Sequence, residues 1–199
     1  MSTTLTYFDF AGSRGEECRL ALHIAGIPFT DDRIDPPTWG KRKAGSPWGS
    51  LPVLEVDGRS LGQCNAILQW VGRTGGLLPS EPWEAARHES ILAACEDLRH
   101  SFQPALREKD ADRKKAAREA FAAGYLQRWA ADLEREIQGP FVGGADLSVA
   151  DLKVYVCTNW FLSGVVDHVP TDVFAGFPKV LALHAAVKQH PAVQAWYAR

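Results

Sequence analysis

The sequence has few cysteines, a single methionine and no long apolar run. Its cysteines, Cys18, Cys64, Cys95 and Cys157, stand far apart, without a CxxC pair and without paired histidine ligands nearby. This spacing argues against a structural zinc site, and scattered free thiols indicate a reducing cytoplasm. No apolar stretch approaches the roughly 18 residues that a membrane span needs, and the first residues lack the basic and apolar regions of a signal peptide. We therefore expect a cytoplasmic protein that binds no metal and has no membrane segment.

The chain also lacks an excess of charge of either sign. Its formal net charge is −2, with 46% apolar and 23% charged residues. This balance is typical of a globular protein in water, and it argues against nucleic acid or an anionic membrane as the main partner. At 199 residues the chain can form one large domain or two small ones, with ample core either way.

The N-terminal stretch follows a strand, helix, strand pattern. Residues 5–10 are rich in β-forming side chains and alternate in part. Ser13 and Glu16 have the spacing of a capping box that opens a helix, and Gly26 stands where a C-cap glycine ends one. A second strand then runs towards Ile34. Such a βαβ unit predicts that the two strands are parallel.

The stretch from Trp48 to Asn65 combines a hairpin with a helix start. Asp57-Gly58 tolerates the positive φ angles of a two-residue turn. Leu51-Pro52 places a proline at the first position of a strand, where it marks an edge, a turn or a cis bond. A cis proline would leave the Leu51 backbone able to pair with an extended peptide, and the helix that follows Gln63-Cys64 could hold the carboxylate of that peptide. The pattern suggests a site for a small acidic peptide, although an ordinary hairpin followed by a helix explains it equally well.

The two halves of the chain differ in pattern. A short helix near residues 39–43 and another over 64–73 complete the order β-α-β-α-β-β-α, which predicts a thioredoxin-like α/β domain over residues 1–75. Residues 75–82, rich in glycine and proline, are typical of a linker. Strand patterns then disappear, and we expect an all-α domain over residues 84–199.

Helical periods fill this second domain. A helix over residues 83–108 is followed, after a mixed-charge run, by one long helix whose inward face runs from Phe121 to Leu133. Ser148 and Asp151 have capping-box spacing and open a mostly apolar helix that should form the buried centre of the domain. The last predicted helices cover residues 178–189 and 191–198.

A series of short motifs over nearly the whole chain resembles one protein family. In chain order the motifs are Leu5-Thr6-Tyr7-Phe8 with Arg14-Gly15-Glu16, Trp39 with Lys43, Leu51-Pro52-Val53-Leu54-Glu55-Val56-Asp57-Gly58 with Gln63, Glu96-Asp97-Leu98, Ser148 to Asp151, and Pro191-Ala192-Val193-Gln194-Ala195-Trp196. Each motif is weak alone. Together they resemble the sigma class of cytosolic glutathione transferases, which includes haematopoietic prostaglandin D synthases. The resemblance implies the glutathione transferase fold, with glutathione as co-substrate.

By this resemblance Tyr7 is the catalytic residue. Its hydroxyl would donate to the glutathione sulfur and stabilise the thiolate, which is the nucleophilic form of a thiol. Without the family pattern, a strand tyrosine is more often simply part of a core. Arg14 would lie near the thiolate and supply a positive field, although the residue type alone indicates only an exposed position in a first helical turn.

The resemblance also implies a glutathione site and a homodimer. Its glutathione-binding residues would be Tyr7, Trp39, Lys43, Leu51, Pro52, Gln63 and Cys64, with Asp97 reaching the site of the partner subunit. Cys64 stands where the family usually has serine. Because a thiol donates more weakly than a hydroxyl, we expect Cys64→Ser to tighten glutathione binding several-fold.

The electrophile site implied by the resemblance draws on both domains. It would be lined by Phe8, Phe10, Gly12, Phe102, Lys153, Val156, Cys157 and Trp160. Two features depart from the family: Lys153 falls where relatives often carry an aromatic residue, and the segment between Tyr7 and Arg14 is one residue longer than is common. We therefore expect the substrate to differ from those of relatives.

Three functions fit these residues. The leading hypothesis is a detoxifying transferase that conjugates glutathione to small apolar electrophiles. A glutathione-dependent isomerase or peroxidase on the same site is the second, and a non-catalytic carrier of apolar ligands is the third. A thiol-transferase is disfavoured because no cysteine stands at the end of the first strand.

Overall fold

The computed structural model describes residues 2–199 and divides them into two compact units. Unit 1 comprises the residues up to Ser80 together with His190–Arg199, and unit 2 comprises Glu81–Gln189. The sequence pattern assigned the last helix to the second domain, whereas the contacts assign it to unit 1. This last helix contacts α1, where Trp196 Nε1 donates to Glu16 Oε1 at 2.8 Å.

Unit 1 contains a four-stranded mixed sheet. The strands are β1 (Thr3–Phe8), β2 (Thr30–Ile34), β3 (Val53–Val56) and β4 (Arg59–Gly62), in the spatial order β2-β1-β3-β4. The β1 and β2 strands are parallel, as predicted, and β3 is antiparallel to β1 and to β4. The first strand ends two residues earlier than the sequence pattern predicts, because Phe10 N turns back to donate to Phe8 O at 3.0 Å.

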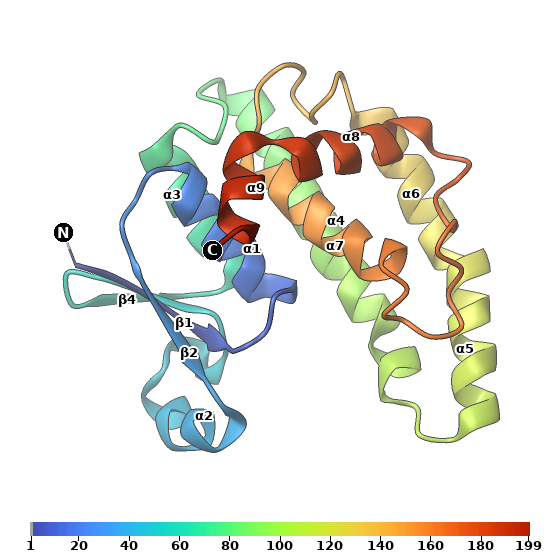
Figure 1. Cartoon of the computed structure of the whole chain (residues 1–199), viewed down its shortest axis with the longest axis horizontal. Helices are drawn as coiled ribbons and strands as arrows, with labels where there is room; N and C mark the ends of the chain where they lie inside the picture. Colours follow the sequence, from blue (N-terminus) through green and yellow to red (C-terminus); the bar gives the residue numbers. More distant parts are fainter. Residues whose placement is uncertain (1) are drawn as a thin grey trace. The chain divides into compact units, whose positions relative to one another are not determined.

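The helices of unit 1 support this sheet. They are α1 (Ser13–Ile24), α2 (Pro36–Arg42), the 3₁₀ turns η1 (Lys43–Gly45) and η2 (Pro47–Gly49), α3 (Cys64–Gly75) and α9 (Pro191–Tyr197). Figure 1 shows α1 and α3 side by side against the sheet, with α9 next to α1. Their apolar faces bury Leu5 of β1, Leu20 of α1 and Ile67 of α3. The thioredoxin-like fold is thereby confirmed.

Unit 2 is entirely helical in its regular structure among the described residues. Its helices are α4 (Pro82–Arg107), α5 (Ala111–Ala123), α6 (Tyr125–Glu136), α7 (Val149–Leu162) and α8 (Pro178–Gln189). The α7 helix packs against α4 and α8 and is buried over most of its length (Figure 1). Its start is the predicted capping box: Asp151 N donates to Ser148 Oγ, and Ser148 N donates to Asp151 Oδ2.

One predicted long helix is broken in the structure. The backbone of Gly124 has φ −109° and ψ −91°, which ends α5 and begins α6. Its N–H donates to both Ala120 O and Phe121 O, at 3.0 and 3.3 Å. A Cβ at this position would lie 2.9 Å from Ala120 O, so glycine permits the close turn.

No helix among the described residues has the length and apolar content needed to cross a membrane. All of the cysteines are free thiols, and each is buried.

Candidate active site

Strand register brings three predicted site residues to one end of the sheet. Thr6 of β1 pairs with Val53 of β3, and Val53 pairs in turn with Gly62 of β4. Tyr7 follows Thr6, Pro52 precedes Val53 and Gln63 follows Gly62. Their backbones therefore adjoin at the same end of the sheet, although they are far apart in the sequence. The Leu51–Pro52 peptide bond is cis, one of the three geometries that the sequence allowed.

Gln63 occupies an unusual backbone conformation between β4 and α3. Its φ of 72° and ψ of 117° place it at positive φ, which non-glycine residues rarely adopt. Its exposed side chain makes no capping hydrogen bond to the N-terminus of α3. Helix N-termini carry N–H groups without intrahelical partners and a partial positive charge, which suit a carboxylate.

The thiol of Cys64, the first residue of α3, is directed towards α1. Its Sγ lies 3.0 Å from Glu17 Oε2, 3.6 Å from Arg14 O and 3.8 Å from Cys18 Sγ. Only 4% of Cys64 is exposed. In this arrangement, the group that Cys64 would offer to a ligand carboxylate is its backbone N–H rather than its thiol.

Tyr7 lies at the end of β1 among aromatic and glycine neighbours. Its ring centroid is 5.8 Å from that of Phe8 and 5.7 Å from that of Phe10. A Cβ on Gly15 of α1 would lie only 2.1 Å from Tyr7 Cδ1, so the ring packs directly on the glycine backbone. The Arg19 guanidinium carbon lies 5.8 Å from the ring centroid.

Trp39 and Lys43 come from the segment after β2. Asp35 caps α2 by accepting from Thr38 N at 2.8 Å, and hydrogen bonds from Thr38 lower the pKa of the Asp35 carboxyl. Trp39 lies half-buried on α2 and lines a polar cavity of about 260 Å³ against the sheet, whereas Lys43 is exposed in η1. Arg14 is half-buried in the first turn of α1.

Phe8 and Phe10 line an open depression of about 740 Å³ in unit 1. Its other walls come from β2 and the start of α2, including Arg33 and Pro36. Phe10 is 45% exposed and therefore offers apolar surface to a ligand. Gly12 lies beside it, at the N-cap of α1.

The predicted electrophile residues of unit 2 form a packed cluster between α4 and α7. The rings of Phe102 and Trp160 meet edge to face at 5.2 Å, and Lys153 Nζ pairs with Glu96 Oε1 at 2.5 Å. Cys157 hydrogen-bonds to Cys95, and this bond, with burial, raises the pKa of the Cys95 thiol. Phe102, Lys153, Val156 and Cys157 are each 7% exposed or less, and Trp160 is half-buried.

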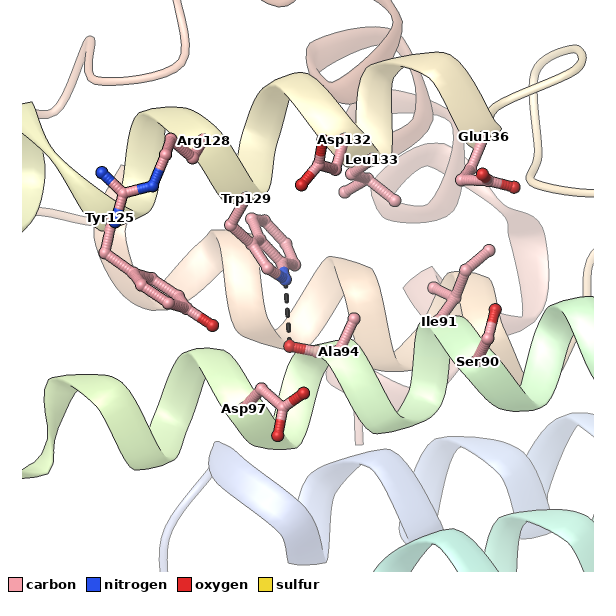
Figure 2. Close-up of a pocket in the computed structure, with 10 residues that line it drawn as sticks. All are labelled: Ser90, Ile91, Ala94, Asp97, Tyr125, Arg128, Trp129, Asp132, Leu133 and Glu136. Atoms are coloured by element: carbon pink, nitrogen blue, oxygen red, sulfur yellow. Dashed lines mark hydrogen bonds between the residues drawn. The ribbon is translucent and has the colours of Figure 1, made fainter.

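Asp97 lies elsewhere in unit 2, on the exposed side of α4. It lines a groove of about 350 Å³ between α4 and α6, where Figure 2 shows it with Tyr125 and Arg128. The groove is closed at its centre by Trp129, whose Nε1 donates to Ala94 O at 3.0 Å.

Sequence reasoning missed two buried charged residues next to this site, Arg19 and Glu17. Both are 0% exposed, within the stretch from Gly15 to Leu22 in which every residue of α1 is buried. A charged residue inside a buried helix is rarely without partners, but the sequence pattern did not show that α1 is buried on all sides.

Comparison with known proteins identifies the family. Residues 14–74 match the glutathione S-transferase N-terminal domain, and residues 96–199 match the glutathione S-transferase C-terminal domain. The chain belongs to the glutathione S-transferase family. The resemblance seen in the sequence is thereby confirmed.

The relatives of this glutathione transferase include prostaglandin synthases. The haematopoietic prostaglandin D synthase of Gallus gallus is 32% identical, over 96% of this chain and 93% of that protein. The solved prostaglandin synthase D of Nilaparvata lugens is 28% identical and superposes with a TM-score of 0.88, covering 100% of this chain and 98% of that one. A monomeric glutathione S-transferase of the hookworm Necator americanus is 30% identical with a TM-score of 0.81, covering 100% and 97%.

Proposed function

We propose that this transferase conjugates the thiolate of glutathione to small apolar electrophiles, with Tyr7 activating the thiol. The observation that carries the proposal is the strand register, which sets Tyr7, Pro52 and Gln63 at one end of the sheet. An extended peptide at this end would pair with the Leu51 backbone and place its carboxylate at the N-terminus of α3. Trp39 and Lys43 would bind its other carboxylate.

The chemical task of the site is to favour the thiolate. The Tyr7 hydroxyl would donate a hydrogen bond to the glutathione sulfur, which stabilises negative charge there. Arg14, in the first turn of α1, would add a positive field. The thiol proton leaves to solvent, and the sulfur then forms a bond to the electrophilic carbon of the second substrate. In a substitution the bond from that carbon to its leaving group, such as chloride, breaks as the leaving group departs with its electron pair. Phe8, Phe10 and Gly12 of unit 1 would contact that substrate.

The alternatives use the same site. The relatives named as prostaglandin D synthases favour a glutathione-dependent isomerase. In a peroxidase the same activated thiolate would reduce a hydroperoxide. A non-catalytic carrier would use the same apolar surface without turnover.

The four free thiols fit a reducing compartment such as the cytoplasm, where glutathione is abundant.

One experiment separates these functions. Wild type and Tyr7→Phe are assayed with glutathione against chlorodinitrobenzene, cumene hydroperoxide and a β,γ-unsaturated ketone, which test conjugation, reduction and isomerisation. Loss of one positioned donor should lower turnover with the preferred substrate by about 10²-fold. Glutathione affinity should change little, and ultraviolet titration should show a higher pKa for the bound thiol.

Tyr197→Phe, an exposed tyrosine of the same unit, is the matched control and should keep full turnover. An unchanged thiol titration in Tyr7→Phe would remove Tyr7 from its role. Binding of apolar ligands without turnover of any probe would favour the carrier.

We also propose that the protein is a homodimer in which Asp97 approaches the glutathione site of the partner subunit. Its exposed position on α4, beside an open groove, leaves its carboxylate available for such a contact (Figure 2). Sedimentation equilibrium tests the assembly. The result is informative because one solved relative is described as monomeric. A monomer with full activity would contradict the proposal.

A further inference from the structure

A buried guanidinium underlies the loop that follows Tyr7. Arg19 of α1 is 0% exposed. Its Nη2 donates to Phe8 O at 3.1 Å and its Nη1 donates to Phe10 O at 3.0 Å. Both carbonyls belong to the turn in which β1 ends. Arginine suits this position because its rigid fork carries several donors in one plane.

The fork is itself fixed by two carboxylates, one from β2 and one from α1 itself. Arg19 Nε donates to Asp31 Oδ1 of β2 at 2.9 Å, and Nη1 lies 3.5 Å from Glu16 Oε2. The other oxygen of Glu16 accepts from Trp196 Nε1 at 2.8 Å. The position of the loop is thus connected to β2 and to the C-terminal helix α9.

This loop needs such support. It rejoins α1 through Ser13, whose φ of 56° is unfavourable for a non-glycine residue. The ring of Tyr7 packs on the backbone of Gly15 on one side and on the ring of Phe10 on another. A shift of the Phe8–Phe10 turn would therefore move the Tyr7 ring.

We propose that Arg19 is a positioning residue, which sets the place of the Tyr7 hydroxyl and of Phe10 by holding the carbonyls of Phe8 and Phe10. This inference rests on the proposed role of Tyr7. Its effect is geometric, because the positive charge of Arg19 faces the carboxylates of both Asp31 and Glu16 and contributes little net field. Small displacements of a reacting group carry large kinetic costs.

Arg19→Lys separates geometry from charge. Lysine keeps the charge and can still pair with Asp31, but it lacks the fork that reaches two carbonyls. We expect turnover with chlorodinitrobenzene to fall about tenfold, with the Michaelis constant for glutathione within about twofold of wild type and a higher pKa for the bound glutathione thiol. Arg73→Lys, on the exposed last turn of α3, is the matched control and should change none of these quantities.

A double substitution tells this proposal apart from the role of Tyr7. If Arg19 acts through Tyr7, Arg19→Lys should have no further effect on turnover in the Tyr7→Phe background. If Tyr7→Phe alone leaves the thiol titration unchanged, the role of Tyr7 fails. If the tenfold loss from Arg19→Lys persists in the Tyr7→Phe background, the proposal that Arg19 positions Tyr7 is overturned, whereas the proposed role of Tyr7 is unaffected.

Trp196→Phe provides a second test of the proposal if the Arg19 variants do not fold. It removes only the donor to Glu16 and keeps an aromatic ring against His23 and Phe29. We expect it to raise the pKa of the bound thiol in the same direction, with turnover lowered about threefold. Wild-type turnover and thiol titration in both Arg19→Lys and Trp196→Phe would overturn the proposal.

Discussion

In unit 1 the candidate site residues stand near the ends of strands: Tyr7 is the last residue but one of β1, Pro52 precedes β3 and Gln63 follows β4. In unit 2 the predicted electrophile residues stand within α4 and α7, where Phe102 and Lys153 are fully buried. The first arrangement is set by backbone register, and the second by packing of side chains. A substitution in unit 1 should therefore change chemistry before stability, and one in unit 2 should change stability before chemistry.

The largest effect that this comparison predicts is for Asp151 in unit 2. Its Oδ1 accepts from Val142 N at 2.7 Å, and its Oδ2 accepts from Ser148 N and Ser148 Oγ at 2.8 and 2.6 Å. Burial raises the pKa of this carboxyl, while the hydrogen bonds of Ser148 and Val142 oppose the shift. Asp151→Ala leaves buried donors without partners and removes the Asp151 half of the capping box of α7, so we expect unfolding to become easier by about 4 kcal/mol.

Urea denaturation measures this change. Asp146→Ala, an exposed acid in the same loop, should stay within about 0.5 kcal/mol of wild type. The comparison of the units also requires that folded Asp151→Ala keep the glutathione affinity of wild type. A stable Asp151→Ala with weak glutathione binding would break that comparison.

The second prediction concerns pH and His184 of α8. Its Nδ1 lies 3.0 Å from Thr158 Oγ1, which also contacts Val154 O at 2.8 Å. Burial lowers the pKa of His184 to about 4, below its ordinary value of 6.5. The unfolded chain therefore takes up a proton at a higher pH than the folded chain, and stability is lost as pH falls from about 6.5 to about 4.

From pH 7.5 to 4.5 this loss should amount to about 2.5 kcal/mol. His184→Gln removes the titrating group. Over the same pH range, the loss of stability in this variant should therefore be smaller than the loss in wild type by about 2.5 kcal/mol. His100→Gln removes an exposed histidine of the same unit and serves as the control. Equal losses in wild type and His184→Gln would show that the imidazole is solvated in the folded protein.

Much of the fold could be predicted because local patterns agree with it. The alternation in β1, the Asp57-Gly58 turn and the Ser148–Asp151 capping box are each short-range signals. The break at Gly124 was not predictable, since one glycine inside a helical period costs only about 1 kcal/mol and is often tolerated.

The backbone positions of the candidate site residues could be predicted, but their buried polar contacts could not. Tyr7, Pro52 and Gln63 follow from strand order and family motifs. Arg19 could not be assigned, because its partners come from β2 and, through Glu16, from Trp196, which lies 180 residues further along the chain. The direction of the Cys64 thiol likewise depends on packing against Glu17 of α1.

The smallest predicted effect belongs to that thiol. From the sequence, Cys64→Ser should tighten glutathione binding several-fold, because a hydroxyl donates better to a carboxylate. The observed direction of Sγ, towards Glu17 Oε2 at 3.0 Å, changes this expectation. A serine hydroxyl would find the Glu17 carboxylate in the same place and donate to it by a charge-assisted bond. We therefore expect the dissociation constant of glutathione to change by less than about twofold.

Calorimetric titration of wild type, Cys64→Ser and Cys64→Ala measures this constant, with Cys18→Ser as the matched control for a nearby buried thiol. Alkylation of Cys64 should be slow, with or without a non-reactive glutathione analogue, because only 4% of the residue is exposed. Binding five times tighter in Cys64→Ser than in both wild type and Cys64→Ala would show that the side chain faces the ligand. The glutathione site of unit 1 would then depend on a side chain at this position as well as on backbone register.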